Sequence, residues 1–517
     1  MDRLDMKDEN IGITRRTVLT AAAGVSAIGL AGQVSAQTQP PVRELYVLDH
    51  DSLNPADQML AQSIQGITSA QESGVWLSGR GIIGIIEGEF RGDGIRVRRA
   101  NNVFDLVRQF KSVIAGAVVY KLGTPSVNVA TSICGGMKAV AIDESLLDQA
   151  KTAGLSLLVD VRDMNEAEAY VKYRRLFSHG ILVEQPVDKP GHLRDFAIAH
   201  RAFTFFTHDS AFRHKVITDL GPNAIVYGWG PDEFGWISDL SAAQSTAGPA
   251  DWSTNLSMLE RLAVTGIKRP FRTSLPKEDG VKYIAFVLSD GDNLQWLGGG
   301  FATSEAFWAS PLRGTFPMTW EVSTLLSKVG PRVLRYLYRH ATQNDGFVAG
   351  AGVPGYTYPH LQPDRFALAQ QAAPMLAEAD LSIASVLNTN SGSLSETAPI
   401  LDLPHIKGVI YKDYAPYNRS QGRVFWHNGK PCVSYRYLLW EGLQEPAEVA
   451  RRFALQPATP LKDVSSYALV QAHAWSYGKT GGPLEAIRRT IELLPPNTRV
   501  VTADQLVELM ARNLGNR

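Results

Sequence analysis

YIAFVLSDGDNLQW, residues 283–296, is an unbroken apolar run that ends in an acidic turn. Six apolar residues in succession, Tyr283 to Leu288, are typical of a strand buried on both faces of a parallel sheet. The turn that follows places Asp290 and Asp292 on either side of Gly291. In β/α barrels the catalytic groups lie at the carboxyl ends of the strands, so this turn is the first candidate for a functional site.

Further strand candidates follow at regular intervals, and helical patterns separate most of them. The strand candidates are 283–288, 317–322, 346–349, 382–387, 406–411, 432–436, 467–472 and 499–501, and the helical patterns are 331–341, 363–377, 446–454, 483–493 and 503–513. Strands alternating with helices over roughly 240 residues match the size of a β/α barrel. The fifth and sixth strands lack a helix between them. Residues 273–517 are therefore predicted to form an irregular, TIM-like (β/α) barrel.

Upstream of this region, shorter blocks also alternate strand and helix patterns, which favours small α/β domains. We expect three of them, over residues 37–115, 116–180 and 181–272, with the Pro- and charge-rich stretch 270–277 as the boundary. The predicted fold class is α/β: small N-terminal α/β domains followed by the irregular barrel.

The first 36 residues have the pattern of a removable export signal. Arg15-Arg16 precedes an Ala- and Gly-rich stretch, and Val34-Ser35-Ala36 places small residues before a cleavage point. The paired arginines indicate a twin-arginine signal, which the twin-arginine export machinery would read. We expect a periplasmic or secreted protein without a stable membrane anchor, because the residue directly after the cleavage point is not the cysteine that a lipid anchor needs.

The composition excludes several classes of partner. Of 517 residues 44% are apolar and 20% are charged, with 51 Lys and Arg against 51 Asp and Glu. This balance gives no electrostatic reason to expect nucleic acid or an anionic membrane. Two cysteines, Cys134 and Cys432, cannot build a disulfide framework or a Cys-based zinc site, and we expect two reduced, buried thiols.

Carboxylates recur at the predicted strand ends and are the catalytic candidates. These are Asp290 and Asp292, with Glu321, Asp413 or Glu441 as the opposing group. Paired carboxylates can perform acid/base chemistry or ligate a metal. Structural roles are also open: the two aspartates could cap the next helix, and Glu321 could stabilise a helix N-terminus.

Other polar and aromatic residues near the same predicted rim are candidates for binding a substrate. They are Asn293, Trp296, Tyr356, Tyr358, Arg436, Trp440, Glu441, His473 and Trp475. Flat aromatic faces beside carboxylates suit stacking on sugar rings, although a buried tryptophan is usually core, Arg436 could form a structural ion pair and His473 could be a core histidine. The upstream stretch 229–236 repeats the mixture of aromatic and acidic residues and could lean over the rim.

The run GVPGYTYP, residues 352–359, resembles the signature of the GxGYxYP family, which carries a glycoside hydrolase label. Gly355, Tyr356, Tyr358 and Pro359 match, whereas Val353 stands where the first glycine of the signature belongs. We expect Gly355 to take a positive φ and the two tyrosines to point to the same side of an extended segment.

The resemblance implies an exported hydrolase that cleaves a carbohydrate with paired carboxylates. Two alternatives remain open at this point. A metal-dependent sugar deacetylase would use Asp290 and Asp292 to hold a divalent cation, with His473 as a ligand or general acid, although the chain has no His-x-x-x-His pair. A binding protein without catalysis would use the aromatic rim alone. No cofactor is otherwise expected.

Overall fold

The computed structural model describes residues 39–515, except residues 222, 263, 265, 271–273, 416 and 418. The chain from Pro40 onward forms one compact unit. The expected export signal, residues 1–36, lies outside the described residues and stays a prediction. Both cysteines are free and buried, as expected.

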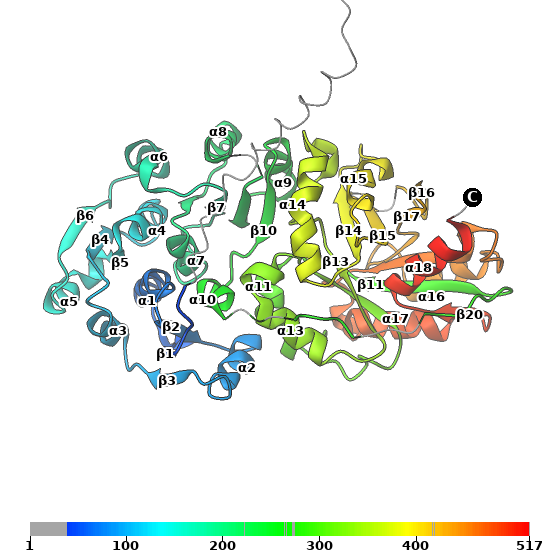
Figure 1. The fold of residues 1–517 in the computed structure, drawn as a ribbon, viewed down its shortest axis with the longest axis horizontal. Coiled ribbons are helices and arrows are strands. Elements are labelled where there is room, and N and C mark those ends of the chain that lie inside the picture. Colours follow the sequence, from blue (N-terminus) through cyan, green and yellow to red (C-terminus); the bar gives the residue numbers. More distant parts are fainter. Residues whose placement is uncertain are drawn as a thin grey trace, which may run out of the picture. The chain divides into compact units, whose positions relative to one another are not determined.

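Three small parallel sheets come first along the chain (Figure 1). The first has the order β2-β1-β3, the second β5-β4-β6 and the third β10-β9-β7-β8. Their strands are β1 (Glu44–Asp49), β2 (Ser73–Ser78), β3 (Arg96–Arg99), β4 (Gly116–Tyr120), β5 (Ala139–Asp143), β6 (Leu157–Asp160), β7 (Ile181–Glu184), β8 (Phe203–Phe205), β9 (Ile225–Gly228) and β10 (Thr246–Pro249). Their helices are α1 (Pro55–Thr68), α2 (Ile82–Glu89), α3 (Val103–Gln109), α4 (Ser126–Met137), α5 (Leu147–Thr152), α6 (Glu166–Tyr173), α7 (Arg194–Ala199), α8 (Ser210–Leu220), α9 (Glu233–Ala242) and α10 (Leu256–Arg261).

Local sequence signals set many of these helix starts. The Asn54 side chain accepts a hydrogen bond from the Asp57 backbone N–H, and Pro55 takes the first helical position of α1. Asn165 and Glu168 form a reciprocal capping box at the start of α6. In the C-terminal part, Pro331 and Pro446 begin α13 and α16.

A large curled sheet follows, in the order β16-β17-β15-β14-β13-β12-β11-β19-β18, with β20 paired to β11. Its strands are β11 (Lys282–Leu288), β12 (Met318–Val322), β13 (Asp345–Ala349), β14 (Ile383–Asn388), β15 (Gly408–Asp413), β16 (Val424–His427), β17 (Lys430–Ser434), β18 (Tyr437–Leu439), β19 (Tyr467–Ala472) and β20 (Thr498–Val500). Its helices are α11 (Leu294–Leu297), α12 (Leu326–Val329), α13 (Pro331–Arg339), α14 (Arg365–Glu378), α15 (Ala398–Leu401), α16 (Pro446–Ala454), α17 (Gly482–Glu492) and α18 (Ala503–Leu514).

Each predicted strand of the C-terminal region overlaps a strand of this sheet. In the part of the chain that it describes, the structure also has no helix between the fifth and sixth predicted strands. Instead β15 leads to β16, which pairs antiparallel with β17 as a hairpin. After β17 the chain moves from the β15 side of the sheet to the β19 side. Tyr435 N–H still donates to Tyr411 O of β15 at 3.1 Å, whereas the next residue, Arg436, donates its N–H to Leu469 O of β19 at 2.9 Å. The fold is thus mixed α/β, with small parallel-sheet domains and a large half-barrel sheet.

Both faces of the large sheet are buried, which explains its unbroken apolar strands. Alternate residues such as Tyr283, Ala285 and Val287 pack on one face together with α18 side chains, including Leu506 and Met510. The intervening residues of the strands, such as Phe286 and Trp320, pack on the other face with helices including α13 and α17. We call the α18 side the inner face of the sheet and the opposite side the outer face. Strand alternation therefore decides which polar side chains reach the inner face.

Candidate functional site

The acidic turn after β11 has a constrained backbone. Asp290 has a φ of 70°, a left-handed conformation that non-glycine residues rarely adopt. The Ser289 hydroxyl donates a hydrogen bond to the Asp290 carboxylate. Asn293 Nδ2 donates to Asp290 O at 3.2 Å, and Asn293 precedes α11. Among the described residues no side-chain hydrogen bond caps α11, so the two aspartates do not cap this helix as the structural alternative supposed. Asn293 instead closes the turn that presents the carboxylates.

Glu321 enters the site from the neighbouring strand. It is the fourth residue of β12 and, because Trp320 packs on the outer face, it faces the inner side of the sheet. Ser385 Oγ of β14 donates to Glu321 Oε1 at 2.5 Å. The other oxygen, Oε2, is buried without a hydrogen-bond partner among the described residues. Such an unpaired buried oxygen is available to a water or a bound ligand.

The carboxyl groups perturb one another. Burial raises the pKa of Asp292 well above its usual value, and the charges of Asp290 and Glu321 raise it further. Burial also raises the pKa of Glu321, while the Lys412 ammonium and the Ser385 hydrogen bond oppose that rise. Asp292 is therefore the carboxyl group of this cluster whose pKa burial and like charge raise furthest.

An aromatic wall stands beside the acidic turn. Trp440, after β18, stacks on His473, after β19, with ring centroids 3.7 Å apart and an interplanar angle of 6°. Tyr417 packs on Trp440 at 4.6 Å. Burial lowers the pKa of His473, the Asp290 charge opposes this, and the Lys412 charge lowers it further. The charges of Asp290 and Lys412 thus act on His473 in opposite directions.

The two tyrosines of the signature segment, Tyr356 and Tyr358, are buried and lie close together. Tyr356 and Tyr358 bring their hydroxyls to 3.3 Å, which confirms that they point to the same side. Tyr356 Oη also donates to Glu233 Oε1 at 2.7 Å, so the upstream 229–236 stretch does reach this region. The Tyr356 backbone pairs with Ala247 of β10. The signature segment therefore joins the third small sheet to the curled sheet.

The expectation for Gly355 is wrong. Its φ is not positive; Gly352 is the glycine of this segment with a positive φ, 87°. Gly355 is needed for space instead, because a Cβ there would lie 2.3 Å from Ala247 O. The antiparallel contact between Tyr356 and Ala247 draws the two backbones too close for a side chain.

Three other candidates have partners away from the acidic turn. Asp413 is buried and accepts from Ser420 N–H at 3.0 Å and from Arg419 Nη2 at 3.4 Å. Arg436 Nη2 donates to Gly422 O at 3.4 Å. Glu441 is exposed and accepts from Tyr477 N–H at 3.1 Å. Strand alternation explains two of these positions, since Asp413 follows inner-facing Lys412 and Arg436 follows inner-facing Tyr435.

Two of the three predicted tryptophans, Trp296 and Trp475, contact each other. Trp296 of α11 and Trp475 lie 4.8 Å apart, and Phe307 packs against both. Trp475 keeps 54% of its surface exposed. Trp475 thus presents an exposed aromatic surface two residues after His473.

Lys412, Ser385 and Glu233 are site residues that the sequence reasoning missed. Lys412 is not among the candidates from the sequence, because its neighbour Asp413 has the more familiar catalytic chemistry. The signal was present in the alternation of β15: Ile410 packs on the inner face and Tyr411 on the outer one, which places Lys412 inside. Ser385 follows from Ile383 in the same way.

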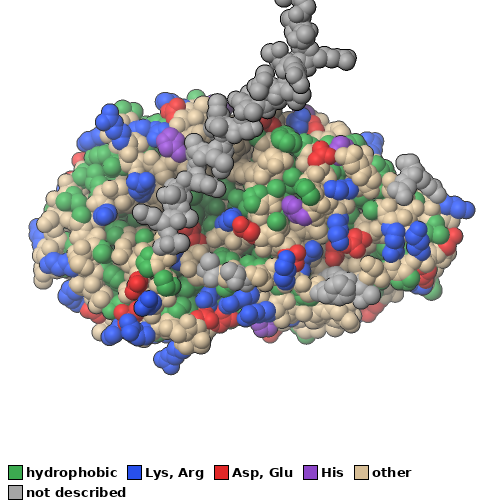
Figure 2. Space-filling model, in the orientation of Figure 1, with side chains coloured by type: hydrophobic (Ala, Val, Ile, Leu, Met, Phe, Trp, Pro, Cys, Tyr) green, Lys and Arg blue, Asp and Glu red, His purple; other side chains and the backbone are tan. Residues whose placement is uncertain are grey.

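The described residues hold no group of three or more His, Cys, Asp or Glu side chains that could hold a metal ion. No helix within the described ranges is long and apolar enough to span a membrane. Figure 2 shows basic and acidic side chains interspersed over the visible face, in keeping with the balanced composition.

Comparisons with known proteins add the family. Residues 280–511 match the "GxGYxYP putative glycoside hydrolase C-terminal domain", residues 179–260 the "GxGYxYP third domain" and residues 114–179 the "GxGYxYP_N second domain". The chain belongs to the GxGYxYP family. The matched segments cover most of the chain, including the signature and the acidic turn.

A solved structure has the same architecture. The crystal structure of a "putative hydrolase" from Bacteroides thetaiotaomicron VPI-5482 is 26% identical, with a TM-score of 0.83, over 92% of this chain and 96% of that one. No curated protein matches the chain. The family and this neighbour both support a hydrolase, and the family label supports a carbohydrate substrate.

Proposed function

We propose that this GxGYxYP protein is a glycoside hydrolase whose catalytic centre is the acidic turn after β11. The observation that carries the proposal is the cluster of Asp290, Asp292 and Glu321 at adjacent strand ends, in which burial and like charge raise the pKa of Asp292. A glycosidase needs one carboxyl group that is protonated at neutral pH and a second that is ionised. The curled sheet then acts as an irregular, TIM-like barrel that gathers these groups at one rim.

The environments suggest different roles for the three carboxyl groups. Asp292 is the proton donor to the departing glycosidic oxygen. Asp290, which is partly exposed and accepts from Ser289 Oγ, is the partner that acts as nucleophile or as base toward water. Glu321 is held by Ser385 and lies within the field of Lys412, and its charge keeps the pKa of Asp292 high. In this scheme Asp413 positions the loop that contains Ser420.

The aromatic side chains supply the binding surface in this proposal. The stacked pair of Trp440 and His473 and the exposed face of Trp475 offer flat surfaces beside the carboxylates. Such surfaces stack on the apolar faces of sugar rings. Tyr356 and Tyr358 are buried and bonded to each other, so they support the rim from below rather than contact the sugar.

Aryl glycosides with leaving groups of different acidity test the roles. Asp292→Asn should lower kcat/KM by about 10²–10⁴-fold on glycosides with poor leaving groups and much less on 2,4-dinitrophenyl glycosides, because the latter need no acid. Asp290→Asn should lose activity on both. Azide should restore turnover in one variant only, and the anomer of the azide product reports retention or inversion. Equal losses for both substrates in Asp292→Asn would refute the assignment of the acid.

Elemental analysis and ligand binding separate the alternatives. A stoichiometric metal in the purified protein, lost in Asp290→Asn or Asp292→Asn, would favour the deacetylase and acetylated glycans as its substrates. Unchanged glycan affinity in Asp290→Asn, with no bond cleaved by either protein, would favour a binding protein. N-terminal sequencing of the exported protein tests cleavage after Ala36, and with it the proposed twin-arginine route.

A further inference from the structure

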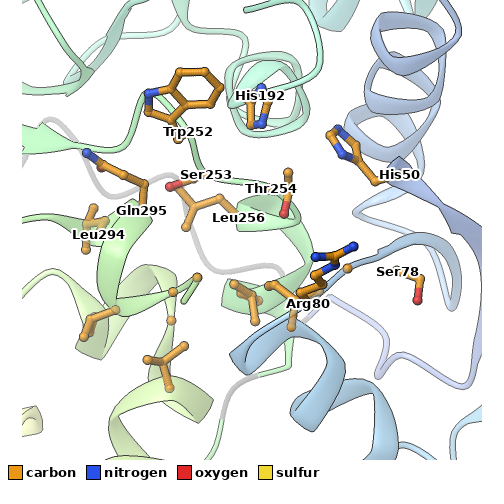
Figure 3. A pocket seen from close by; sticks show the side chains of 18 of the residues that line it. His50, Ser78, Arg80, His192, Trp252, Ser253, Thr254, Leu256, Leu294 and Gln295 are labelled. Carbon is orange, nitrogen blue, oxygen red and sulfur yellow. The ribbon is translucent and has the colours of Figure 1, made fainter. Parts of the chain in front are cut away.

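A cavity separate from the acidic turn lies where three sheets present their carboxyl ends (Figure 3). Its volume is about 700 Å³ with the open mouth included. His50 follows β1, Arg80 follows β2, Trp252 follows β10 and Gln295 lies in α11 after β11. Open α/β sheets bind ligands outside their carboxyl ends.

The walls of this cavity are held in place by buried contacts. The Asn255 side chain donates to Leu77 O at 2.8 Å and accepts from Leu77 N–H at 2.7 Å, which fixes the loop after β10 against β2. Leu193 N–H donates to Ser253 O at 2.8 Å. On the opposite side, Ile82 N–H donates to Gly299 O at 3.0 Å. The cavity is therefore a pre-formed feature of the fold.

A chain of hydrogen bonds fixes the orientation of the Gln295 side-chain amide. The Asp290 carbonyl can only accept, so Asn293 must turn its Nδ2 toward it. Asn293 Oδ1 then faces Gln295 and accepts from Gln295 Nε2 at 3.0 Å. Gln295 Oε1 is left buried, with no hydrogen-bond partner among the described residues. A ligand must donate a hydrogen to satisfy this oxygen.

Two further residues that line the cavity each have an unpaired polar atom. Ser253 is 6% exposed, and its Oγ is buried without a partner in the described part of the chain. The same holds for His192 Nδ1. Burial lowers the pKa of His192 to about 4, so the ring is neutral at pH 7. These three atoms form a neutral set that suits a group able both to donate and to accept.

The remaining lining groups favour a compact uncharged ring. Trp252 keeps 57% of its surface exposed and packs against the His192 ring with centroids 4.9 Å apart. The charged side chains are at the open side: Arg80 has a side chain that is 96% exposed and lies 3.9 Å from Asp51. An anion inside would face Gln295 Oε1, which repels it, whereas a hydroxyl would donate to that oxygen.

We infer that this cavity is a binding site for a neutral, hydroxyl-rich molecule of about one sugar ring. Sugar hydroxyls pair with Gln295, Ser253 and His192, and the ring lies near the indole of Trp252. The site binds without bond cleavage and does not depend on the proposed hydrolysis.

Titration with D-glucose, D-galactose, D-mannose and D-xylose tests this inference on the full-length mature protein, by calorimetry and saturation-transfer NMR. At least one sugar should bind saturably. Gln295→Met and Ser253→Ala should each weaken that binding about tenfold, because each leaves sugar hydroxyls unpaired. Trp252→Ala should also weaken sugar binding, and because Trp252 is exposed this substitution should leave the fold intact. Gln149→Met, an identical change at an exposed position on α5, should not alter the affinity.

Three results of such titrations would overturn the inference, and a fourth comes from the Asp292→Asn protein. They are the absence of saturable binding by any of the four sugars, equal affinities in the wild type, Gln295→Met and Trp252→Ala, and displacement of the sugar by inorganic phosphate. The Asp292→Asn protein should bind the sugar as the wild type does. Loss of binding in that variant would place the sugar at the acidic turn instead. Because only binding is measured, failure of the hydrolase proposal would leave these outcomes unchanged.

Discussion

Gly291 lies against the backbone of Glu321 so closely that a Cβ on Gly291 would be 2.0 Å from Glu321 O and 2.6 Å from Glu321 Cβ. Real Cβ atoms do not approach other heavy atoms to this distance. The glycine between the two aspartates thus allows the end of β11 to meet β12, and it brings Glu321 beside the acidic turn.

Gly291→Ala should therefore destabilise the protein and disturb the site together. We expect the free energy of unfolding to fall by about 1–3 kcal/mol, the usual cost of overpacking, with loss of most activity. Urea unfolding measures the first effect. Gly300→Ala is the matched control, because no atom lies within 4 Å of a Cβ at that position. Equal stability of the two variants would contradict this account of the turn.

Glu321→Gln should shift the pH profile of hydrolysis toward acid. The Glu321 charge raises the pKa of Asp292, so removing the charge lowers that pKa. If Asp292 must be protonated to donate, the alkaline limb of kcat/KM moves to lower pH. Glu492→Gln, an exposed glutamate on α17, should leave the limb in place. An unchanged limb in Glu321→Gln would argue against Asp292 as the acid.

Asp292→Asn should increase stability at neutral and alkaline pH. The folded pKa of Asp292 is raised, so its contribution to stability is complete below the unfolded pKa of about 4 and is lost as the pH rises through the folded pKa. Each unit of that rise corresponds to about 1.4 kcal/mol. The Tm difference between variant and wild type should thus grow from pH 4 to pH 9. A constant difference would mean that Asp292 ionises freely in the folded protein.

Lys412→Met should raise two pKa values at once. The Lys412 ammonium lowers the pKa of both Glu321 and His473, so its removal should shift both upward. NMR titration of the His473 ring reports the second shift directly. Lys407→Met provides the control, because Lys407 pairs with Glu508 on the surface. No movement of the His473 titration would mean that Lys412 does not face the site.

Trp475→Ala should weaken substrate binding without loss of stability. Trp475 is 54% exposed, so little packing is lost, while a stacking face worth about 0.5–1.5 kcal/mol disappears. KM should rise about 2–10-fold at nearly constant kcat and Tm. Phe366, 60% exposed on α14, is the matched aromatic control. Similar KM values for the two variants would remove Trp475 from the binding surface.

Much of the curled sheet could be predicted because its strands are apolar runs bounded by helical patterns and prolines. Local signals also located the acidic turn, since the strand 283–288 and the residues after it are contiguous in the chain. The same local reasoning chose Asp413 over its neighbour Lys412, because position along the chain says that a residue is at a strand end but not on which face of the sheet it lies. Gly355 shows the same limit, since its role depends on Ala247, more than a hundred residues earlier.

The chain alone determined the kinds of side chain available at the rim, the strands that carry them and the resemblance to the GxGYxYP family, because these depend on neighbouring residues. The tertiary structure decided which of those side chains meet. Glu321, Ser385 and Lys412 share the inner face because three strands curl together, and Gly291 admits Glu321 because two backbones touch. Those approaches depend on packing between distant segments, and so do the raised pKa of Asp292 and the closed wall of Trp440 and His473.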